Sequence, residues 1–176
     1  WEIYLKFGVD GFAEINGQFA LALFNPSDQT LLLAVDRWAA RSLYFAPYAN
    51  RVAFASESKA LMALDDVPAR ANLAAIDYLQ RSKYLPPGRG PAADLYPVAP
   101  GSWVRLRSDG WEAGAYRPMQ LEIRSGASEE TIAGELRDTI LAATSRLVRG
   151  GEPIGLALSA GVDSTLTLGA IRAVEP

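Results

Sequence analysis

Two apolar runs separated by a short polar turn are the feature that most constrains the fold of this chain. Phe19 to Phe24 reads "FALALF", Thr30 to Asp36 reads "TLLLAVD", and "NPSDQ" lies between them. Pro and Asp occupy positions that a type I turn favours, so the runs predict an antiparallel hairpin with a loop of about five residues. Because both runs are apolar on both faces, they indicate a sheet covered on both sides.

The flanking segments predict further antiparallel structure. Trp1 to Phe7 is typical of the end of a helix that Gly8 stops, and the start without Met or a cap indicates a fragment of a longer protein. A second hairpin, two helices and a last pair of strands follow. We expect the hairpin at 43–46 and 52–55, and the two helices at 56–64 and at 72–85, the latter with Asn72 as its N-cap. The last two strands are expected on either side of Asp109-Gly110.

The composition shifts after Tyr116. "SEETIAGELRDTILAATSRLV" predicts a long helix that begins at Ser128, with acidic residues in its first turn. A buried strand over Ile154–Leu158 and a helix over Thr165–Val174 are expected after it. We therefore predict a first domain over 1–118, a linker over 119–127 and the start of a second domain over 128–176.

Two absences limit the chemistry. The chain has no cysteine and no histidine, which excludes a thiolate nucleophile, a Ser-His-Asp triad and most zinc sites within it. The net charge of −3 is mild and the basic residues are scattered, so we expect no nucleic-acid partner. No apolar run is long enough for a membrane helix, and the lack of cysteine favours a cytoplasmic location.

One loop has the composition of an anion site. Ser159-Ala160-Gly161-Val162-Asp163-Ser164 lies between the expected strand and helix, where backbone N–H groups and the helix dipole favour negative charge. The chain has no Gly-Lys pair, so this is not a Walker A loop. Asp163 would repel phosphate unless a cation such as Mg²⁺ lay between them. The alternative is that Asp163 simply caps the helix.

The loop resembles the Ser-Gly-Gly-x-Asp-Ser pyrophosphate loop of the ATP-pyrophosphatase superfamily. The preceding chain is similar to one branch of that superfamily, the asparagine synthase (glutamine-hydrolysing) family. Four segments resemble its motifs in the same order, namely "INGQFALALF", "DRWAARSLYF", "FASESKAL" and "YPVAPGSWVRL".

The resemblance implies an α+β fold. The first domain would be a partial class II glutamine amidotransferase domain of the N-terminal nucleophile type, an antiparallel two-sheet sandwich with helices. The second would be the first βα unit of an α/β pyrophosphate-loop domain. The family's nucleophilic Cys lies upstream of Trp1, so no catalytic residue is expected in this chain. The residues implied to bind the pyrophosphate of ATP are Leu158, Ser159, Ala160, Gly161, Val162, Asp163 and Ser164, with Asp163 also a candidate Mg²⁺ ligand.

Three residues depart from the family pattern. Ala160 stands where the family has Gly, and a positive φ there would strain an alanine. Ala39 and Ser42 replace a Gly and a Pro in a turn that we expect to be structural. Asp36 and Arg37, just before it, are interpreted as a buried ion pair at a strand end, although they could instead line a path between domains.

The expected activity is that of an ATP-dependent ligase that adenylates an aspartate-like carboxylate for attack by glutamine-derived ammonia. The expected partners are ATP, Mg²⁺, a carboxylate substrate, and glutamine or ammonia delivered through the upstream half; a homodimer is compatible. One alternative is intramolecular amide formation, as in β-lactam or lasso-peptide cyclases, with an inactive glutaminase domain. Another is a non-catalytic binding module. The fragment alone is expected to be inactive.

Overall fold

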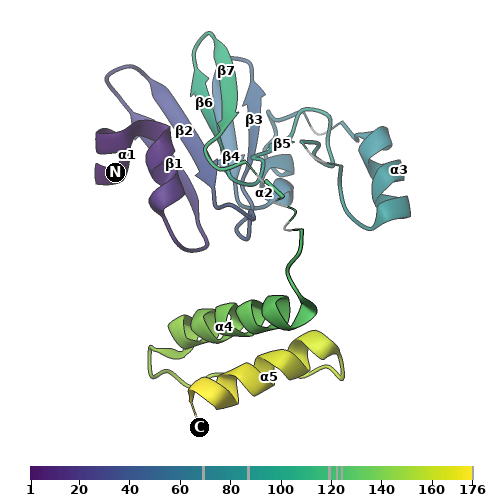
Figure 1. Ribbon diagram of the computed structural model, residues 1–176. Helices are drawn as coiled ribbons and strands as arrows, with labels where there is room; N and C mark the ends of the chain where they lie inside the picture. The colour runs from purple at the N-terminus through teal and green to yellow at the C-terminus, as the bar shows by residue number, and fades with distance from the viewer. Residues whose placement is uncertain (69, 87, 119, 122, 124, 176) are drawn as a thin grey trace. The chain divides into compact units, whose positions relative to one another are not determined.

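The computed structural model describes residues 1–68, 70–86, 88–118, 120–121, 123 and 125–175. It contains two compact units, Trp1–Gln120 and Leu121–Pro176 (Figure 1). Their boundary lies inside the 119–127 segment where the sequence predicts a linker. Each unit is described separately below.

The first sheet of unit 1 is built around the hairpin that the sequence predicts. Strand β1 (Ala20–Asn25) pairs antiparallel with β2 (Thr30–Val35), in a register that places Ala20 opposite Val35. The turn between them is held by the Asn25 and Asp28 side chains, which accept the N–H groups of Ser27 and Thr30. Strands β6 (Ser102–Arg107) and β7 (Gly110–Ala115) complete the order β1-β2-β6-β7, so both predicted hairpins of this sheet are confirmed.

The second sheet contains β4 (Arg51–Ala55), β3 (Tyr44–Tyr48) and the short β5 (Tyr96–Pro97), in the order β4-β3-β5. All of its pairs are antiparallel. The predicted second hairpin is therefore confirmed, with β3 extending two residues further than the apolar run "LYFA" indicates.

Three apolar clusters arrange unit 1 in layers. Leu33 and Val35 of β2 pack with Phe45 of β3 between the two sheets. On the outer face of the first sheet, Leu32 packs against Phe12 from the N-terminal helices. On the outer face of the second sheet, Leu61 of the helix after β4 lies in another buried cluster. Strand β2 is thus buried on both faces, and the expected α+β two-sheet sandwich is confirmed.

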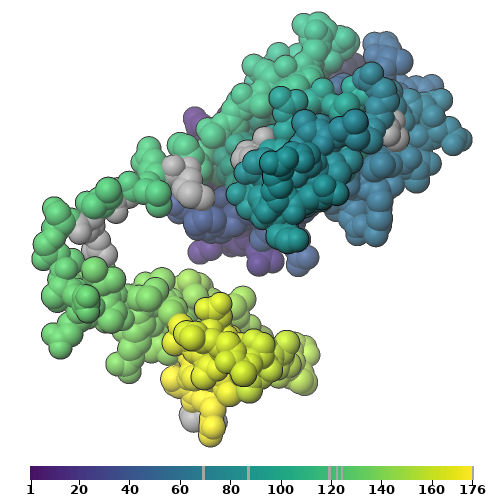
Figure 2. Space-filling view, turned by 90° about the vertical axis from the view of Figure 1, so that its right-hand side faces the viewer, coloured from purple at the N-terminus to yellow at the C-terminus, as the bar shows by residue number. Residues whose placement is uncertain are grey.

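The helices of unit 1 lie where the sequence predicts them, but several of their boundaries differ. Helix α1 (Glu2–Phe7) ends at Gly8, whose φ is +64°, but an unpredicted 3₁₀ helix, η1 (Gly8–Glu14), follows. Helix α2 (Ser58–Met62) is shorter than predicted. In α3 (Leu73–Ser82) the Asn72 side chain accepts the Ala75 N–H, as expected of an N-cap. This helix stops at Lys83 (φ +68°), before the predicted end at Leu85. Teal side chains of α3 lie at the surface of unit 1 (Figure 2).

The described residues of unit 2 form two helices, α4 (Glu129–Val148) and α5 (Val162–Val174). The Ser128 hydroxyl accepts the Thr131 N–H at 3.2 Å, which confirms the predicted cap of α4. The strand predicted over Ile154–Leu158 is absent: these residues belong to no strand. A strand exists only through ladder hydrogen bonds, and no described segment pairs with this apolar run.

Candidate functional site

The predicted phosphate loop lies at the N-terminus of α5. Its last three residues, 162–164, form the first turn of the helix rather than part of the loop. Leu158 is 58 % exposed and precedes the loop, and Ser159, Ala160 and Gly161 are exposed as well. The structure thus presents the predicted residues on one exposed loop and helix start.

The Ser164 side chain closes this loop. Its hydroxyl accepts the Ser159 N–H at 3.2 Å and lies 3.1 Å from the Ser159 hydroxyl. Carbonyl acceptors for the Ser164 hydroxyl are Ser159 at 3.0 Å and Gly161 at 3.2 Å. The Gly161 N–H in turn donates to the Ser159 carbonyl. The two serines are therefore held together by contacts that sequence spacing did not predict.

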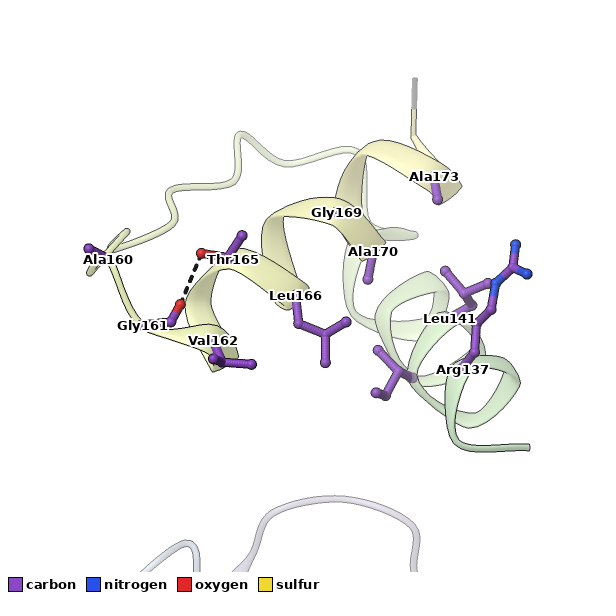
Figure 3. Close-up of a pocket in the computed structure, with 11 residues that line it drawn as sticks. Arg137, Leu141, Ala160, Gly161, Val162, Thr165, Leu166, Gly169, Ala170 and Ala173 are labelled. Atoms are coloured by element: carbon purple, nitrogen blue, oxygen red, sulfur yellow. Dashed lines mark hydrogen bonds between the residues drawn. The ribbon is translucent and has the colours of Figure 1, made fainter. Parts of the chain in front are cut away.

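The first turn of α5 offers backbone donors to an anion. The N–H groups at the start of a helix have no intrahelical acceptor, and the helix dipole adds partial positive charge there. The Gly161 carbonyl already accepts the N–H and the hydroxyl of Thr165, at 3.2 and 2.9 Å (Figure 3). The first-turn N–H groups are the donors that suit phosphate at the N-terminal end of α5, although the Asp163 carboxylate, an acceptor, lies in the same turn.

Ala160 fits this loop without backbone strain. Among the described residues, a positive φ at a non-glycine position occurs at Gln29, Ala39, Ala49 and Lys83. Ala160 is not one of them, so the expected penalty for alanine does not arise there. The strain falls instead on Ala39 (φ +48°), the other position where the family motif has Gly. A glycine at that turn would have no such penalty.

Asp163 satisfies part of what a Mg²⁺ site requires. Its carboxylate is exposed and makes no hydrogen bond or ion pair with any described residue, although its main-chain carbonyl accepts the Thr167 hydroxyl at 2.8 Å. No cluster of three or more Asp, Glu, His or Cys residues occurs in the described part of the chain. Mg²⁺ commonly takes one or two carboxylates together with phosphate oxygens, so Asp163 fits that role only when a phosphate is also bound.

An apolar groove of about 650 Å³ runs beside the loop, between α4 and α5. Leu166 of α5 and Leu141 of α4 point toward the space between the helices (Figure 3). The groove also includes Ala160 and Gly161, and its charged lining residue is Arg137. Because an apolar lining cannot replace the hydration of phosphate, an anion would lie at the loop end of the groove rather than along it.

Asp36 is the most heavily hydrogen-bonded side chain of unit 1. Its carboxylate is buried and accepts the backbone N–H groups of Phe19, Trp38, Ala40 and Arg41, at distances of 2.9 to 3.3 Å. Burial alone would raise the pKa of Asp36, but the four N–H donors outweigh it and hold that pKa below its usual value. Asp36 therefore stays ionised and ties the ends of β1 and β2 to the following turn.

The ion pair expected between Asp36 and Arg37 does not form. The Arg37 guanidinium lies over the Trp38 ring, 5.2 Å from its centre, and Arg37 Nε has no hydrogen-bond partner among the described residues. Backbone N–H groups satisfy Asp36 instead because its chain turns tightly directly after β2. An Asp side chain directly after an apolar strand was the available signal for such a turn.

A cleft of about 660 Å³ opens between the two sheets of unit 1. Phe24 and Trp111 line it from the first sheet and Phe54 from the second, together with Arg51 and Arg107. The described lining of this cleft contains no carboxylate. None of the helices in the described chain combines the length and apolarity needed to cross a membrane.

Residues 1–117 match the profile of a family described as glutamine amidotransferase domain. The two-sheet sandwich and this match show that the chain belongs to the glutamine amidotransferase domain family. The resemblance to the asparagine synthase family that the motifs indicated is confirmed as well.

The relatives span both units. The chain is 27 % identical over 180 residues to asparagine synthetase [glutamine-hydrolyzing] 1 of Bacillus subtilis, covering 98 % of this chain and 27 % of that protein. It is 24 % identical over 176 residues to amidase chry2 of Gibberella zeae, covering 96 % and 25 %. The putative asparagine synthetase [glutamine-hydrolyzing] 2 of Methanocaldococcus jannaschii is 21 % identical over 181 residues, covering 97 % and 34 %. The chain thus spans about a quarter to a third of these relatives.

Proposed function

We propose that this chain is part of an ATP-dependent amide-forming ligase of the asparagine synthase type. Residues 1–118 would belong to its glutamine amidotransferase domain, 119–127 to a linker, and 128–176 to the start of its ATP-binding domain. The observation that carries the proposal is the loop 158–164 at the start of α5, which follows a unit of the amidotransferase family. Relatives named as asparagine synthetases align with both units, which supports it.

In this proposal a carboxylate oxygen attacks the α-phosphorus of ATP, and the bond to pyrophosphate breaks. Ammonia then displaces AMP from the acyl-adenylate to form the amide. The role of this chain is to hold the leaving pyrophosphate, with the first-turn N–H groups of α5 as donors. The hydroxyls of Ser159 and Ser164, which here bond to each other and to nearby carbonyls, would turn to donate when pyrophosphate binds. Mg²⁺ beside Asp163 would supply neutralisation of phosphate charge.

The nucleophile for glutamine hydrolysis is not in these residues, since the chain contains no cysteine. Ammonia would therefore come from a part of the full-length protein outside Trp1–Pro176. We accordingly expect no glutamine hydrolysis by the 176-residue chain itself.

A second candidate is amide hydrolysis without adenylation, because one relative is named amidase chry2 and another, 24 % identical, amidase chyE. A third, intramolecular amide formation, needs no glutamine. Two assays on the full-length protein separate the three: ammonia release from glutamine, and exchange of labelled pyrophosphate into ATP with a panel of carboxylates. The ligase gives both activities, the amidase gives only ammonia release, and the cyclase gives only exchange. If the full-length protein shows neither ammonia release nor pyrophosphate exchange with any carboxylate tested, the proposal is contradicted.

A further inference from the structure

The segment where the chain leaves β7 is attached to three separate parts of unit 1. The Tyr116 hydroxyl donates to the Val35 carbonyl at 2.6 Å, at the end of β2. The Arg117 guanidinium donates through Nη1 to the Ala13 carbonyl at 2.9 Å, in η1. The backbone N–H groups of Tyr116 and Arg117 both donate to the Gly101 carbonyl, at 3.0 and 3.2 Å.

The contact of Gly101 with the exit segment requires a glycine at this position. Its φ is +61°, and a Cβ there would lie 2.5 Å from the Arg117 carbonyl oxygen. Its own N–H donates to the carbonyl of Asp36 at 3.0 Å. The exit segment is therefore bound to the same turn that the Asp36 carboxylate organises. Burial of the Tyr116 side chain raises its pKa, and the negative charge of Asp36 raises that pKa further.

Pro118 is the next residue along the chain. Pro118 has no N–H to donate, and a proline also restricts the residue before it to extended conformations. The described residues from 118 to 127 lie in neither helix nor strand, and α4 begins only at Glu129. Among the described residues, the hydrogen bonds that hold this segment to the rest of unit 1 are those of Tyr116 and Arg117.

We propose that Tyr116 and Arg117, with their acceptors Val35, Gly101 and Ala13, form an exit clamp that fixes where and in which direction the connecting segment leaves unit 1. The clamp holds the start of that segment at a defined place on unit 1. This inference concerns unit 1 alone and does not depend on the proposed ligase activity.

Amide hydrogen exchange of the 176-residue chain, followed by NMR, tests the clamp. In the unchanged chain the Tyr116 and Arg117 amides should exchange at least tenfold more slowly than that of Leu121, which is 88 % exposed. Tyr116→Phe and Arg117→Gln each remove one side-chain contact and should each accelerate exchange at both amides at least tenfold. Chymotrypsin, which cuts after Tyr or Phe, should then also cleave after position 116.

Arg107→Gln is the matched control, since it removes only an exposed ion pair with Glu112, at 3.6 Å, on the same hairpin. Its exchange at 116 and 117 should equal that of the unchanged chain. The clamp is overturned if the Tyr116 and Arg117 amides of the unchanged chain exchange as fast as Leu121. It is equally overturned if both substitutions leave exchange unchanged, or accelerate it to the same degree throughout the β6–β7 ladder, which would indicate a general loss of stability.

Discussion

Asp36 and Phe19 are joined twice, once through the backbone and once through a side chain. The Asp36 N–H donates to the Phe19 carbonyl at 2.9 Å, and the Phe19 N–H donates to the Asp36 carboxylate at 3.2 Å. This pair closes the open end of the β1–β2 hairpin. Strand β2 is thereby fixed to the turn that leads into the second sheet.

Replacing Asp36 should destabilise unit 1 more than replacing another turn carboxylate. Asp36→Asn substitutes an N–H₂ group for one acceptor oxygen and leaves buried backbone donors unpaired, so we expect a loss of about 2–3 kcal/mol in the free energy of unfolding. Asp28→Asn is the control, because Asp28 accepts only the Thr30 N–H, near the surface. Urea unfolding measures both. Equal losses for the two variants would show that the Asp36 hydrogen bonds add nothing special.

The same carboxylate should make stability depend on pH. The pKa of Asp36 is lower in the folded chain than in the unfolded chain, so the unfolded state binds the proton more tightly. This contribution to stability is fully present above the unfolded pKa of about 4, and it is lost as the pH falls through the folded value. Urea unfolding between pH 7 and pH 3 should show the decrease, and Asp36→Asn should make it smaller. A decrease of the same size in Asp36→Asn would assign it to other carboxyl groups.

Ala39→Gly should stabilise the chain even though it removes a methyl group. Ala39 has a φ of +48°, which costs alanine roughly 1–2 kcal/mol, and glycine avoids this at an unfolded-state entropy cost of roughly 0.4–1 kcal/mol. We expect a gain of about 0.5 kcal/mol. Ala40→Gly in the same turn, where φ is not positive, should lose stability instead. Thermal unfolding compares the two, and a loss at both positions would contradict the strain at Ala39.

Alanine substitutions at Gly101 and Gly8 distinguish the energetic cost of backbone strain from that of a steric clash. Both have a positive φ, +61° and +64°, but a Cβ at Gly101 meets the Arg117 carbonyl whereas nothing lies within 4 Å of one at Gly8. Gly8→Ala should therefore cost about 1 kcal/mol and Gly101→Ala about 2–4 kcal/mol in the free energy of unfolding. If the two costs are equal, Arg117 moves aside freely and the close contact at Gly101 has no energetic weight.

The hairpins of unit 1 could be predicted because their information is local. The apolar runs define the strands, and the turns at Pro26–Asp28 and at Asp109-Gly110 lie within a few residues of the strands that they connect. The strand over Ile154–Leu158 was predicted wrongly because an apolar run does not reveal whether a partner strand pairs with it. The N-cap residues Asn72 and Ser128 were predicted correctly because capping depends on the next three residues alone.

The parts that sequence reasoning missed depend on contacts between distant segments. Phe19 and the Gly101 turn meet Asp36 only after the strands align, whereas the other three donors to Asp36 follow it within five residues. The exit clamp joins Tyr116 to Val35 for the same reason. At the loop, the sequence predicted which residues cluster but not that Ser164 closes onto Ser159. The sequence also led us to expect backbone strain from an alanine in place of glycine at Ala160, although the positive φ lies at Ala39.

The most direct test of the proposed function is exchange of labelled pyrophosphate into ATP by the full-length protein carrying Ser164→Ala. Ser164 contacts Ser159 at the loop, whereas Thr167, one turn later on α5, donates only to the Asp163 carbonyl. If residues 158–164 hold the pyrophosphate, Ser164→Ala should reduce exchange about 100-fold and Thr167→Ala should leave it nearly unchanged. Exchange that is unaffected by Ser164→Ala, or reduced equally by both substitutions, would contradict the assignment of this loop.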